Sequence, residues 1–255
     1  MRLALGVEYA GEAFFGWQTQ ERVRTVQQCV ETGLSRVANH PVTVCCAGRT
    51  DRGVHALGQV IHTEIHATRK LHAWVLGTNT YLPDDVKILW AQPVDDQFHA
   101  RFSAIQRHYR YILLNRLSPP AVFAKKMAWE YRPLDVEKMH DAGQYLLGKH
   151  DFSAFRAAGC QAKHPVRTVS QLQVTRQGDQ VHIDISADGF LYHMVRNITG
   201  VLVEIGRDSR PVTWVKFLLE SKDRKIAAMT APADGLYFCG ADYPPEYQLP
   251  RWSTV

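Results

Sequence analysis

The densest cluster of polar residues in the sequence, Ala47–Ala56, holds one carboxylate, Asp51, between Arg49 and Arg52. An apolar stretch precedes it, which predicts a loop at the end of a strand, where functional side chains often lie. The two glycines in the cluster permit tight turns or the close approach of another segment. Nearby cations favour an ionised carboxylate, which a nucleophile or a general base requires. A turn held by an ion pair between Asp51 and an arginine explains the same pattern at least as well.

Cations and aromatic rings are interleaved in a second segment, Phe98–Tyr111. Such a mixture suits phosphate contacts combined with base stacking on RNA. At strand periodicity Tyr109 and Tyr111 share one face and Arg110 points the other way. One tyrosine can therefore belong to the core while the other offers a stacking surface. A half-buried strand whose arginines only face water is an equally good interpretation.

A third segment, Asp188–Asn197, leads into a stretch that is apolar on most sides of a helix and contains Arg196. A buried guanidinium needs a partner, because an unpaired charge in the interior is very costly. Asp51 is a candidate partner. The alternative is that Arg196 reaches water at the edge of the helix.

No metal or cofactor signature is complete among the twelve histidines and the glycines of the chain. His62-Thr63-Glu64 matches the first half of a zinc deaminase signature, but no Pro-Cys-x-x-Cys follows. An HExxH motif, a phosphate-binding Walker loop and a dinucleotide fingerprint are absent as well. We therefore expect no metal and no cofactor, with His62, His66 and His72 at the surface or hydrogen-bonded within the protein.

Composition narrows the class of protein further. The chain has 255 residues, a net charge of +5 and five cysteines without any CxxC spacing. This cysteine usage and the lack of a secretion signal predict a reduced, cytoplasmic protein. The sequence contains no run of about 18 apolar residues, so we expect no membrane span. The basic balance suits a nucleic-acid partner without establishing one.

These segments must be positioned by a mixture of strands and helices. Residues 3–9 predict a half-buried strand, Thr25 with Gln28 predicts a capping box, and Asp135 predicts another helix cap. The 176–180 stretch predicts a hairpin turn, and we expect the tail, 243–255, to be loosely packed. The other patterns predict strands over 42–47, 58–64, 86–91, 108–114, 169–175, 181–187 and 236–241, and helices over 26–38, 71–77, 136–147, 190–205 and 212–219. The fold class expected is α+β, as two α+β units.

Taken together, these residues resemble the TruA family of tRNA pseudouridine synthases over nearly the whole chain. The motifs that carry the resemblance are Tyr9-Ala10-Gly11, Phe15-Gly16-Trp17-Gln18, Thr25-Val26-Gln27, Ala47–Ala56, Phe98–Tyr111, Asp151–Arg156, His193–Asn197 and Gly235-Leu236-Tyr237. Two small departures are Arg52, where a smaller residue is common, and Asp188-Gly189, where some relatives carry Asn-Ala.

The resemblance implies an enzyme that isomerises uridine to pseudouridine at positions 38, 39 and 40 of the tRNA anticodon stem-loop. It implies that Asp51 is the nucleophile on a flipped-out uridine. It further implies that four residues bind the substrate, and that others contact tRNA. The substrate-binding residues are Tyr109, which packs on the uracil, Arg49, Leu236 and Arg196, which pairs with Asp51. The tRNA contacts are Arg69, Lys70, His99, Arg101, Arg156 and Lys163.

The implied fold has two α+β halves around a central, mainly antiparallel sheet, with the active cleft between them. We place the catalytic aspartate in the half spanning 1–105, and the stacking tyrosine and helix arginine in the half spanning 106–255. The resemblance also implies a homodimer. Two other classes of protein use similar surfaces: a non-catalytic RNA-binding protein or tRNA chaperone, and a metal-dependent nucleic-acid hydrolase.

Overall fold

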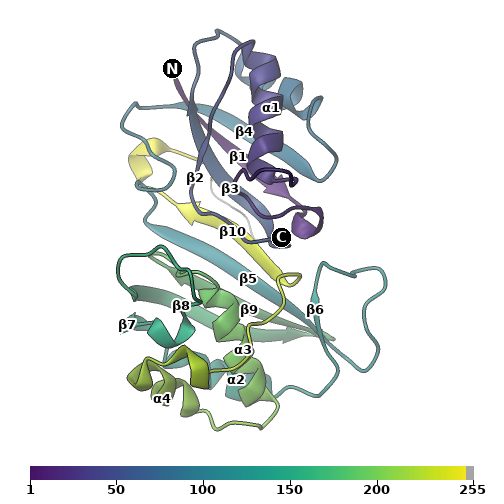
Figure 1. The fold of residues 1–255 in the computed structure, drawn as a ribbon, viewed down its shortest axis with the longest axis vertical. Helices are drawn as coiled ribbons and strands as arrows, with labels where there is room; N and C mark the ends of the chain where they lie inside the picture. The colour runs from purple at the N-terminus through teal and green to yellow at the C-terminus, as the bar shows by residue number, and fades with distance from the viewer. Residues whose placement is uncertain (251–255) are drawn as a thin grey trace. The chain divides into compact units, whose positions relative to one another are not determined.

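The computed structural model describes residues 1–250 and shows an α+β fold with mainly antiparallel strand pairing (Figure 1). The chain forms two compact units, Met1–Arg107 with Tyr237–Val255, and His108–Leu236. The boundary expected after residue 105 lies two residues before the end of the first segment at Arg107. Residues 237–250, expected in the second half, group with the first unit, where the last strand runs parallel to the strand His55–Glu64. Within 1–250, no helix has both the length and the apolar character needed to cross a membrane.

The first unit is built on β1 (Arg2–Tyr9), which lies between β3 (His55–Glu64) and β4 (Val86–Val94), antiparallel to both. The short β2 (Cys45–Cys46) pairs with the outer part of β3, and β10 (Leu236–Asp242) runs parallel to the start of β3. The expected strand over 42–47 is thus shorter than predicted, with only two residues paired.

The prediction that β1 is half-buried is wrong. Its residues from Leu3 to Val7 are buried on both faces of the sheet. Trp90 of β4 covers the position of Gly6, where a Cβ atom would lie 2.1 Å from the indole nitrogen. The alternation of small and large apolar residues therefore reflects two covered faces rather than one that is open to water.

Helix α1 (Val26–Ala38) has the predicted bounds and buries Val26, Val30 and Leu34. The predicted capping box is wrong, because Thr25 makes no side-chain cap bond and its hydroxyl is buried without a partner. The unit also contains the short helices η1 (Gly11–Ala13), η2 (Ala73–Gly77), which is a π-helix, and η5 (Pro245–Tyr247). Where described, the tail is packed rather than loose, because Tyr243 donates a hydrogen bond to the Ala100 carbonyl. Residues 251–255 lie outside the described part.

The second unit has the strand order β5–β9–β8–β7. Its strands are β5 (Gln106–Asn115), β6 (Ala128–Glu130, parallel to β5), β7 (Gly148–Asp151), β8 (Val166–Gln177) and β9 (Gln180–Ala187). Strands β8 and β9 form the predicted hairpin, which turns at Gly178 with a φ of +57°. The hairpin is longer than predicted, since strand pairing extends to Gln177 and Gln180.

The helices of the second unit are α2 (Val136–Gln144), α3 (Met194–Gly206), α4 (Trp214–Ser221), η3 (Ser153–Phe155) and η4 (Arg224–Ile226). The predicted cap of α2 is confirmed, because the Asp135 carboxylate accepts the Lys138 N–H at 3.0 Å. Helix α3 begins four residues later than expected. His193 precedes it with a φ of +59°, so the helix cannot extend back to Phe190.

Candidate functional site

The loop that carries Asp51 leaves β2 and returns into β3, as the sequence predicts. Its base is fixed by Gln59, whose side-chain amide donates to the Gly48 carbonyl at 2.6 Å. The Val54 N–H then donates to the Asp51 carbonyl at 3.1 Å, which closes a tight turn around Gly53 at a φ of +83°. Asp51 itself is half-buried. Its carboxylate therefore sits on a short, hydrogen-bonded loop rather than on a mobile one.

A second segment, Phe14–Trp17, braces this loop from outside. The Trp17 N–H donates to the Thr50 carbonyl at 3.0 Å, and the Gly53 N–H donates to the Phe14 carbonyl at 3.3 Å. Phe14 and Trp17 are buried, so the brace is anchored in the core. These two bonds fix the backbone on both sides of Asp51, and we call Phe14–Trp17 the brace below.

Two further features hold the loop at Thr50. Gly16 has a φ of +92°, and a Cβ atom there would lie 2.6 Å from the Thr50 carbonyl oxygen. The Tyr9 hydroxyl lies 2.7 Å from Oγ1 of Thr50 in a buried hydrogen bond. Burial raises the pKa of Tyr9, so this hydroxyl stays neutral. Sequence reasoning did not give Tyr9 or Gly16 a role. Their only signal was that both belong to motifs shared with the resembled family.

The two arginines beside Asp51 are both exposed. The guanidinium of Arg52 lies 4.2 Å from the centre of the Phe15 ring, in a cation–π contact with the brace. Arg49 is close enough to act electrostatically on the Cys46 thiol. The loop thus presents Arg49 to solvent, while Arg52 has a packing role that explains how a large residue fits there.

His55 was missed by sequence reasoning and supports the far end of the loop. It is buried, and its Nδ1 accepts the Gly11 N–H at 2.9 Å. Its ring stacks on Tyr237 with centroids 4.7 Å apart. Burial raises the pKa of Tyr237 to about 12, with Glu12 nearby. His55 therefore links the loop both to Gly11, near the N-terminus, and to Tyr237 of β10.

In the second unit, the two tyrosines of β5 divide as the sequence analysis proposed. Tyr111 is fully buried and donates a hydrogen bond to the Pro232 carbonyl at 2.7 Å. Tyr109 is half-buried, with the Phe190 ring edge-on at a centroid distance of 5.0 Å. Tyr111 is therefore the core residue, which leaves Tyr109 as the one suited to stacking.

Arg196 is half-buried on α3, and its Nε donates to the Ala231 carbonyl at 2.8 Å. This bond orients the guanidinium from one side. Pairing with Asp51, which belongs to the other unit, stays a prediction. Leu236 is buried, with its N–H bonded to the Ala233 carbonyl at 2.8 Å.

The residues expected to touch tRNA differ in their surroundings. Arg69, Lys70, Arg101 and Lys163 are exposed, while His99 is half-buried. The Arg156 guanidinium is turned inward, where it donates to the carbonyls of Cys160 and Ala162, each at 2.8 Å. Arg156 therefore shapes the loop that presents Lys163.

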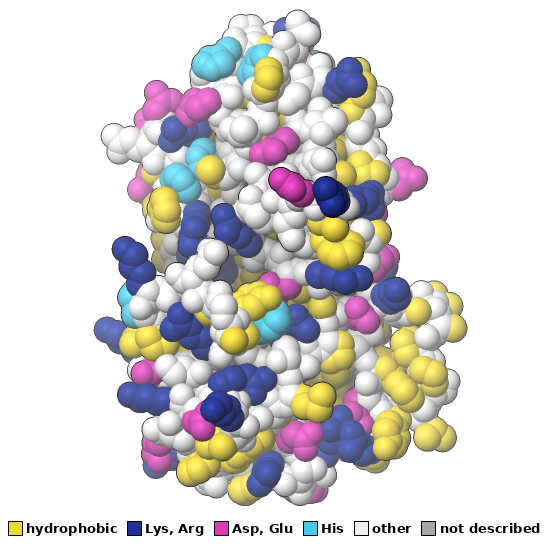
Figure 2. Space-filling model, in the orientation of Figure 1, with side chains coloured by type: hydrophobic (Ala, Val, Ile, Leu, Met, Phe, Trp, Pro, Cys, Tyr) yellow, Lys and Arg dark blue, Asp and Glu magenta, His cyan; other side chains and the backbone are white. Residues whose placement is uncertain are grey.

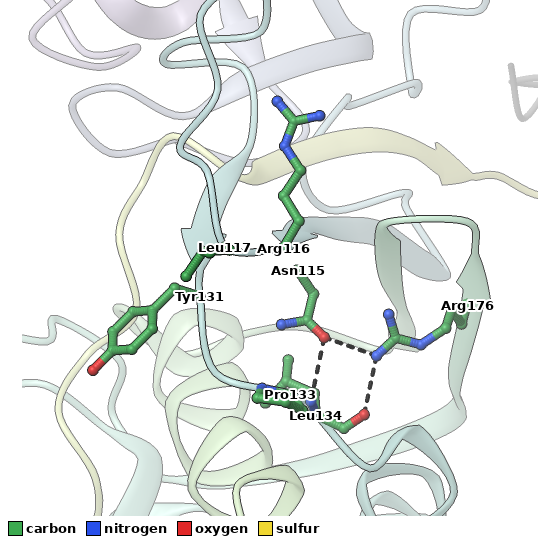
Figure 3. Close-up of a pocket in the computed structure, with 7 residues that line it drawn as sticks. All are labelled: Asn115, Arg116, Leu117, Tyr131, Pro133, Leu134 and Arg176. Atoms are coloured by element: carbon green, nitrogen blue, oxygen red, sulfur yellow. Dashed lines mark hydrogen bonds between the residues drawn. The ribbon is translucent and has the colours of Figure 1, made fainter.

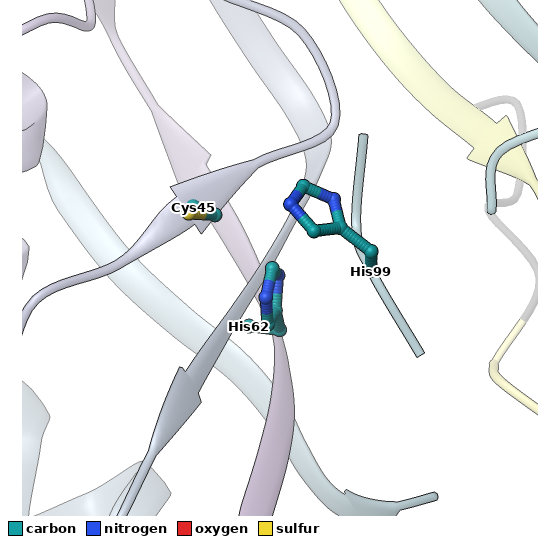
Figure 4. Close-up of side chains that lie close together, drawn as sticks. All are labelled: Cys45, His62 and His99. Atoms are coloured by element: carbon teal, nitrogen blue, oxygen red, sulfur yellow. The ribbon is translucent and has the colours of Figure 1, made fainter. Parts of the chain in front are cut away.

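Cys45, His62 and His99 form a cluster whose potential ligand atoms lie within 4.8 Å of one another (Figure 4). Cysteine and histidine are zinc ligands. However, Nδ1 of His62 accepts the Ala100 N–H and Nδ1 of His99 accepts the Arg101 N–H, each at 3.1 Å. Each neutral ring then carries its proton on Nε2, and binding a metal there would remove that proton as well. The hydrogen bonding disfavours a metal at this cluster.

A pocket of about 450 Å³ lies in the second unit, and Arg176, Asn115 and Leu134 are among the residues that line it (Figure 3). Arg176 closes one side, donating to Oδ1 of Asn115 at 2.8 Å and to the Leu134 carbonyl at 3.0 Å. The lining contains no carboxylate, thiol or histidine. The Arg176 bonds thus serve the local structure of the pocket wall.

A braced loop carboxylate, half-buried Tyr109 and exposed cations on an α+β fold are features of an enzyme that acts on RNA. Comparison with known proteins defines the class further. Residues 6–103 and 142–244 match the family model described as tRNA pseudouridine synthase. The chain belongs to this family, whose members isomerise uridine in tRNA.

Several curated relatives are similar over almost their whole length. A tRNA pseudouridine synthase A from Nitrosococcus oceani is 56% identical, covering 99% of this chain and 98% of that protein. One from Hydrogenovibrio crunogenus is 55% identical, with coverage of 98% and 95%. One from Vibrio parahaemolyticus is 53% identical, with the same coverage of 98% and 95%. The resemblance found in the sequence motifs is confirmed.

Proposed function

We propose that this chain converts uridine to pseudouridine at positions 38, 39 and 40 of the tRNA anticodon stem-loop, with Asp51 as the nucleophile. The family supports the reaction, and the names of the curated relatives support tRNA as substrate. The observation that carries the role of Asp51 is its place on a loop whose backbone is fixed on both sides by the brace. A fixed carboxylate is preorganised for attack.

The reaction needs no external electrons. The bond from uracil N1 to ribose C1′ breaks, a bond from C5 to C1′ forms, the C5 proton is lost and N1 gains a proton. One carboxylate can attack C1′ or add to uracil C6, forming a covalent intermediate. A carboxylate acting as a base at C2′ is a third route. All three require Asp51 ionised and in contact with the nucleotide.

The target uracil must leave its stack to reach Asp51, which costs a few kcal/mol. We assign the ring of Tyr109 to packing on the flipped uracil, where stacking contributes roughly 1–3 kcal/mol. We assign Arg49 to RNA contact beside the loop, Arg196 to pairing with Asp51, and Leu236 to the apolar surface around the base. Arg69, Lys70, His99, Arg101 and Lys163 would contact tRNA, with Arg156 supporting the loop of Lys163.

The test is Asp51→Asn, which keeps the shape of the side chain and removes its charge. We expect no pseudouridine in single-turnover assays with unmodified tRNA transcripts, while the Kd for tRNA changes by less than about threefold. Asp96→Asn is the matched control, because Asp96 is an exposed carboxylate of the same unit. Near-normal conversion by Asp51→Asn would refute the assignment.

We further propose that the protein is a homodimer, as the resemblance implies. The support is a patch of exposed apolar side chains around β6 and the loop before it, seen as the yellow area at the lower right of Figure 2. It comprises Leu117, Val122, Phe123, Trp129 and Tyr131. Contiguous exposed apolar surface of this kind marks interaction sites, and a second copy of the chain is the occupant we assign to it.

Val122 is 88% exposed, and Val122→Asp should place a charge in the dimer interface. We expect sedimentation to show a shift towards monomer. Met229 is 89% exposed outside the patch, so Met229→Asp should leave the dimer intact. A dimer unaffected by Val122→Asp would show that the interface lies elsewhere.

We propose the cytoplasm as the compartment, where tRNA is modified. All five cysteines are free thiols, which suits a reducing environment. We also propose catalysis without a metal or cofactor, since isomerisation consumes no electrons and one carboxylate supplies the nucleophile.

A further inference from the structure

Phe102 stands out among the exposed side chains of the first unit. It is 75% exposed, on the loop between β4 and β5. The loop is held by His99, whose Nδ1 accepts the N–H groups of Arg101 and Phe102 at 3.1 and 3.3 Å. Ser103 closes it, since its N–H donates to the His99 carbonyl at 2.9 Å and its Oγ accepts the His99 N–H at 3.0 Å. The ring is thus presented to solvent by a fixed turn.

Phe102 is the outermost member of a row of rings. The His99 ring lies 4.3 Å from it, at an interplanar angle of 32°. The His62 ring lies 4.5 Å from His99, and Phe98 is edge-on to His62 at 6.0 Å. The inner members of the row are buried or half-buried. This support fixes the orientation of Phe102. The Phe102 side chain would therefore lose little further entropy when a flat ligand stacks on it.

The surroundings of the ring carry positive charge. The exposed guanidinium of Arg101 lies over the Phe102 ring, 5.5 Å from its centre, in a cation–π contact. Burial, together with Arg2 and Arg101, lowers the pKa of His99, so the ring behind Phe102 is neutral at pH 7. An exposed aromatic ring in contact with a cation matches one nucleotide, whose base stacks on the ring while its phosphate meets the cation.

We propose that Phe102 is a stacking platform for an unpaired base of the bound tRNA, with Arg101 holding an adjacent phosphate. This base is distinct from the target uracil, which we assign to Tyr109. The inference rests on tRNA being the substrate and is independent of which residue is the nucleophile. It adds a second aromatic contact to the bound tRNA, besides the one that we assign to Tyr109.

The experiment measures binding of an unmodified tRNA transcript by fluorescence anisotropy, using Phe102→Ala, Phe102→Trp and Ile105→Ala. We expect Phe102→Ala to raise the Kd about tenfold and Phe102→Trp to retain wild-type binding, because stacking depends on a ring. Ile105 is 52% exposed in the same segment and carries no ring, so Ile105→Ala should change the Kd less than twofold. The single-turnover rate at saturating enzyme should be unchanged in Ile105→Ala.

Salt dependence separates the two roles. Phe102→Ala should leave the slope of log Kd against log salt unaltered, while Arg101→Gln should lower its magnitude by about 1, the loss of one phosphate contact. Each unpaired anticodon-loop base is replaced in turn with the fluorescent base 2-aminopurine. The base that stacks on Phe102 is the one whose fluorescence is quenched by the wild-type protein but not by Phe102→Ala.

A Kd within twofold of wild type for Phe102→Ala would overturn the proposal. So would weaker binding that accompanies a lower Tm, or dissociation of the dimer, since either would give Phe102 a structural role. If the wild-type protein binds tRNA through Phe102 but forms no pseudouridine, the proposed activity fails while this inference stands.

Discussion

The hydroxyl oxygen of Tyr9 and Oγ1 of Thr50 lie 2.7 Å apart, one residue before Asp51. Both side chains are buried, and they come from positions 41 residues apart in the chain. The Thr50 carbonyl meanwhile accepts the Trp17 N–H. Thr50 is thus held through both its side chain and its backbone. These contacts fix the backbone from which the Asp51 side chain projects.

We predict that Tyr9→Phe lowers the single-turnover rate about tenfold while the Kd for tRNA stays within twofold. The change removes a hydrogen bond of about 1 kcal/mol and leaves a buried hydroxyl unpaired. Thr50→Val should have a similar effect, and Thr50→Ser, which keeps the hydroxyl, should restore most of the rate. The double variant Tyr9→Phe/Thr50→Val should be no slower than the slower single variant. If its fold-loss in rate equals the product of the two single fold-losses, Tyr9 and Thr50 act independently and the explanation fails.

Gly16 should be intolerant of a side chain. Alanine there meets the Thr50 carbonyl and must also adopt a positive φ, a backbone strain of roughly 1–3 kcal/mol. We expect Gly16→Ala to lower both the Tm and the rate. Gly159 also has a positive φ but nothing within 4 Å, so Gly159→Ala isolates the cost of backbone strain. Equal losses in the two variants, measured by denaturation and single-turnover assay, would show that contact with the loop is unimportant.

His62 should make stability depend on pH. Burial, with His99 and Arg2 nearby, lowers the pKa of His62 to about 4. Below about pH 6.5 the unfolded chain takes up a proton that the folded protein does not, so the free energy of unfolding falls as pH drops towards 4.

The loss attributable to His62 between pH 7 and pH 4.5 should be about 1–2 kcal/mol. His62→Asn keeps an acceptor for the Ala100 N–H and removes the titrating ring, so urea denaturation should show a smaller pH dependence. An identical pH dependence in this variant would assign the effect to His99 or His182, whose pKa values are also lowered, chiefly by burial.

A chelator should leave the activity unchanged. The His62 and His99 rings already accept backbone N–H groups at Nδ1, which disfavours a metal at their cluster with Cys45. We expect equal rates of pseudouridine formation on unmodified tRNA with and without EDTA. Loss of activity in EDTA that zinc restores, together with zinc binding abolished by Cys45→Ser, would instead establish a metal site.

Much of the fold and the candidate site follows from short-range signals in the sequence. The Asp135 cap, the hairpin at Gly178 and the bounds of α1 are encoded within a few residues, because hydrogen bonds and apolar faces there repeat with the period of the helix or strand. The order of motifs along the chain was sufficient to indicate the family and to select Asp51 and Tyr109. Strand alternation placed Tyr109 and Tyr111 on one face, and the structure decided that Tyr111 is the core residue.

Only the tertiary structure decided the contacts between distant segments. The Tyr9–Thr50 bond, the backbone brace from Phe14–Trp17 and the burial of both faces of β1 depend on strand register and packing, which no local pattern specifies. Thr25 shows the converse, since a capping pattern that is valid locally was not used once the residue was buried. The sequence by itself indicated the family and predicted which residues do the chemistry. The fold decided how Asp51 is held, because rigidity comes from contacts that exist only after distant segments are brought together.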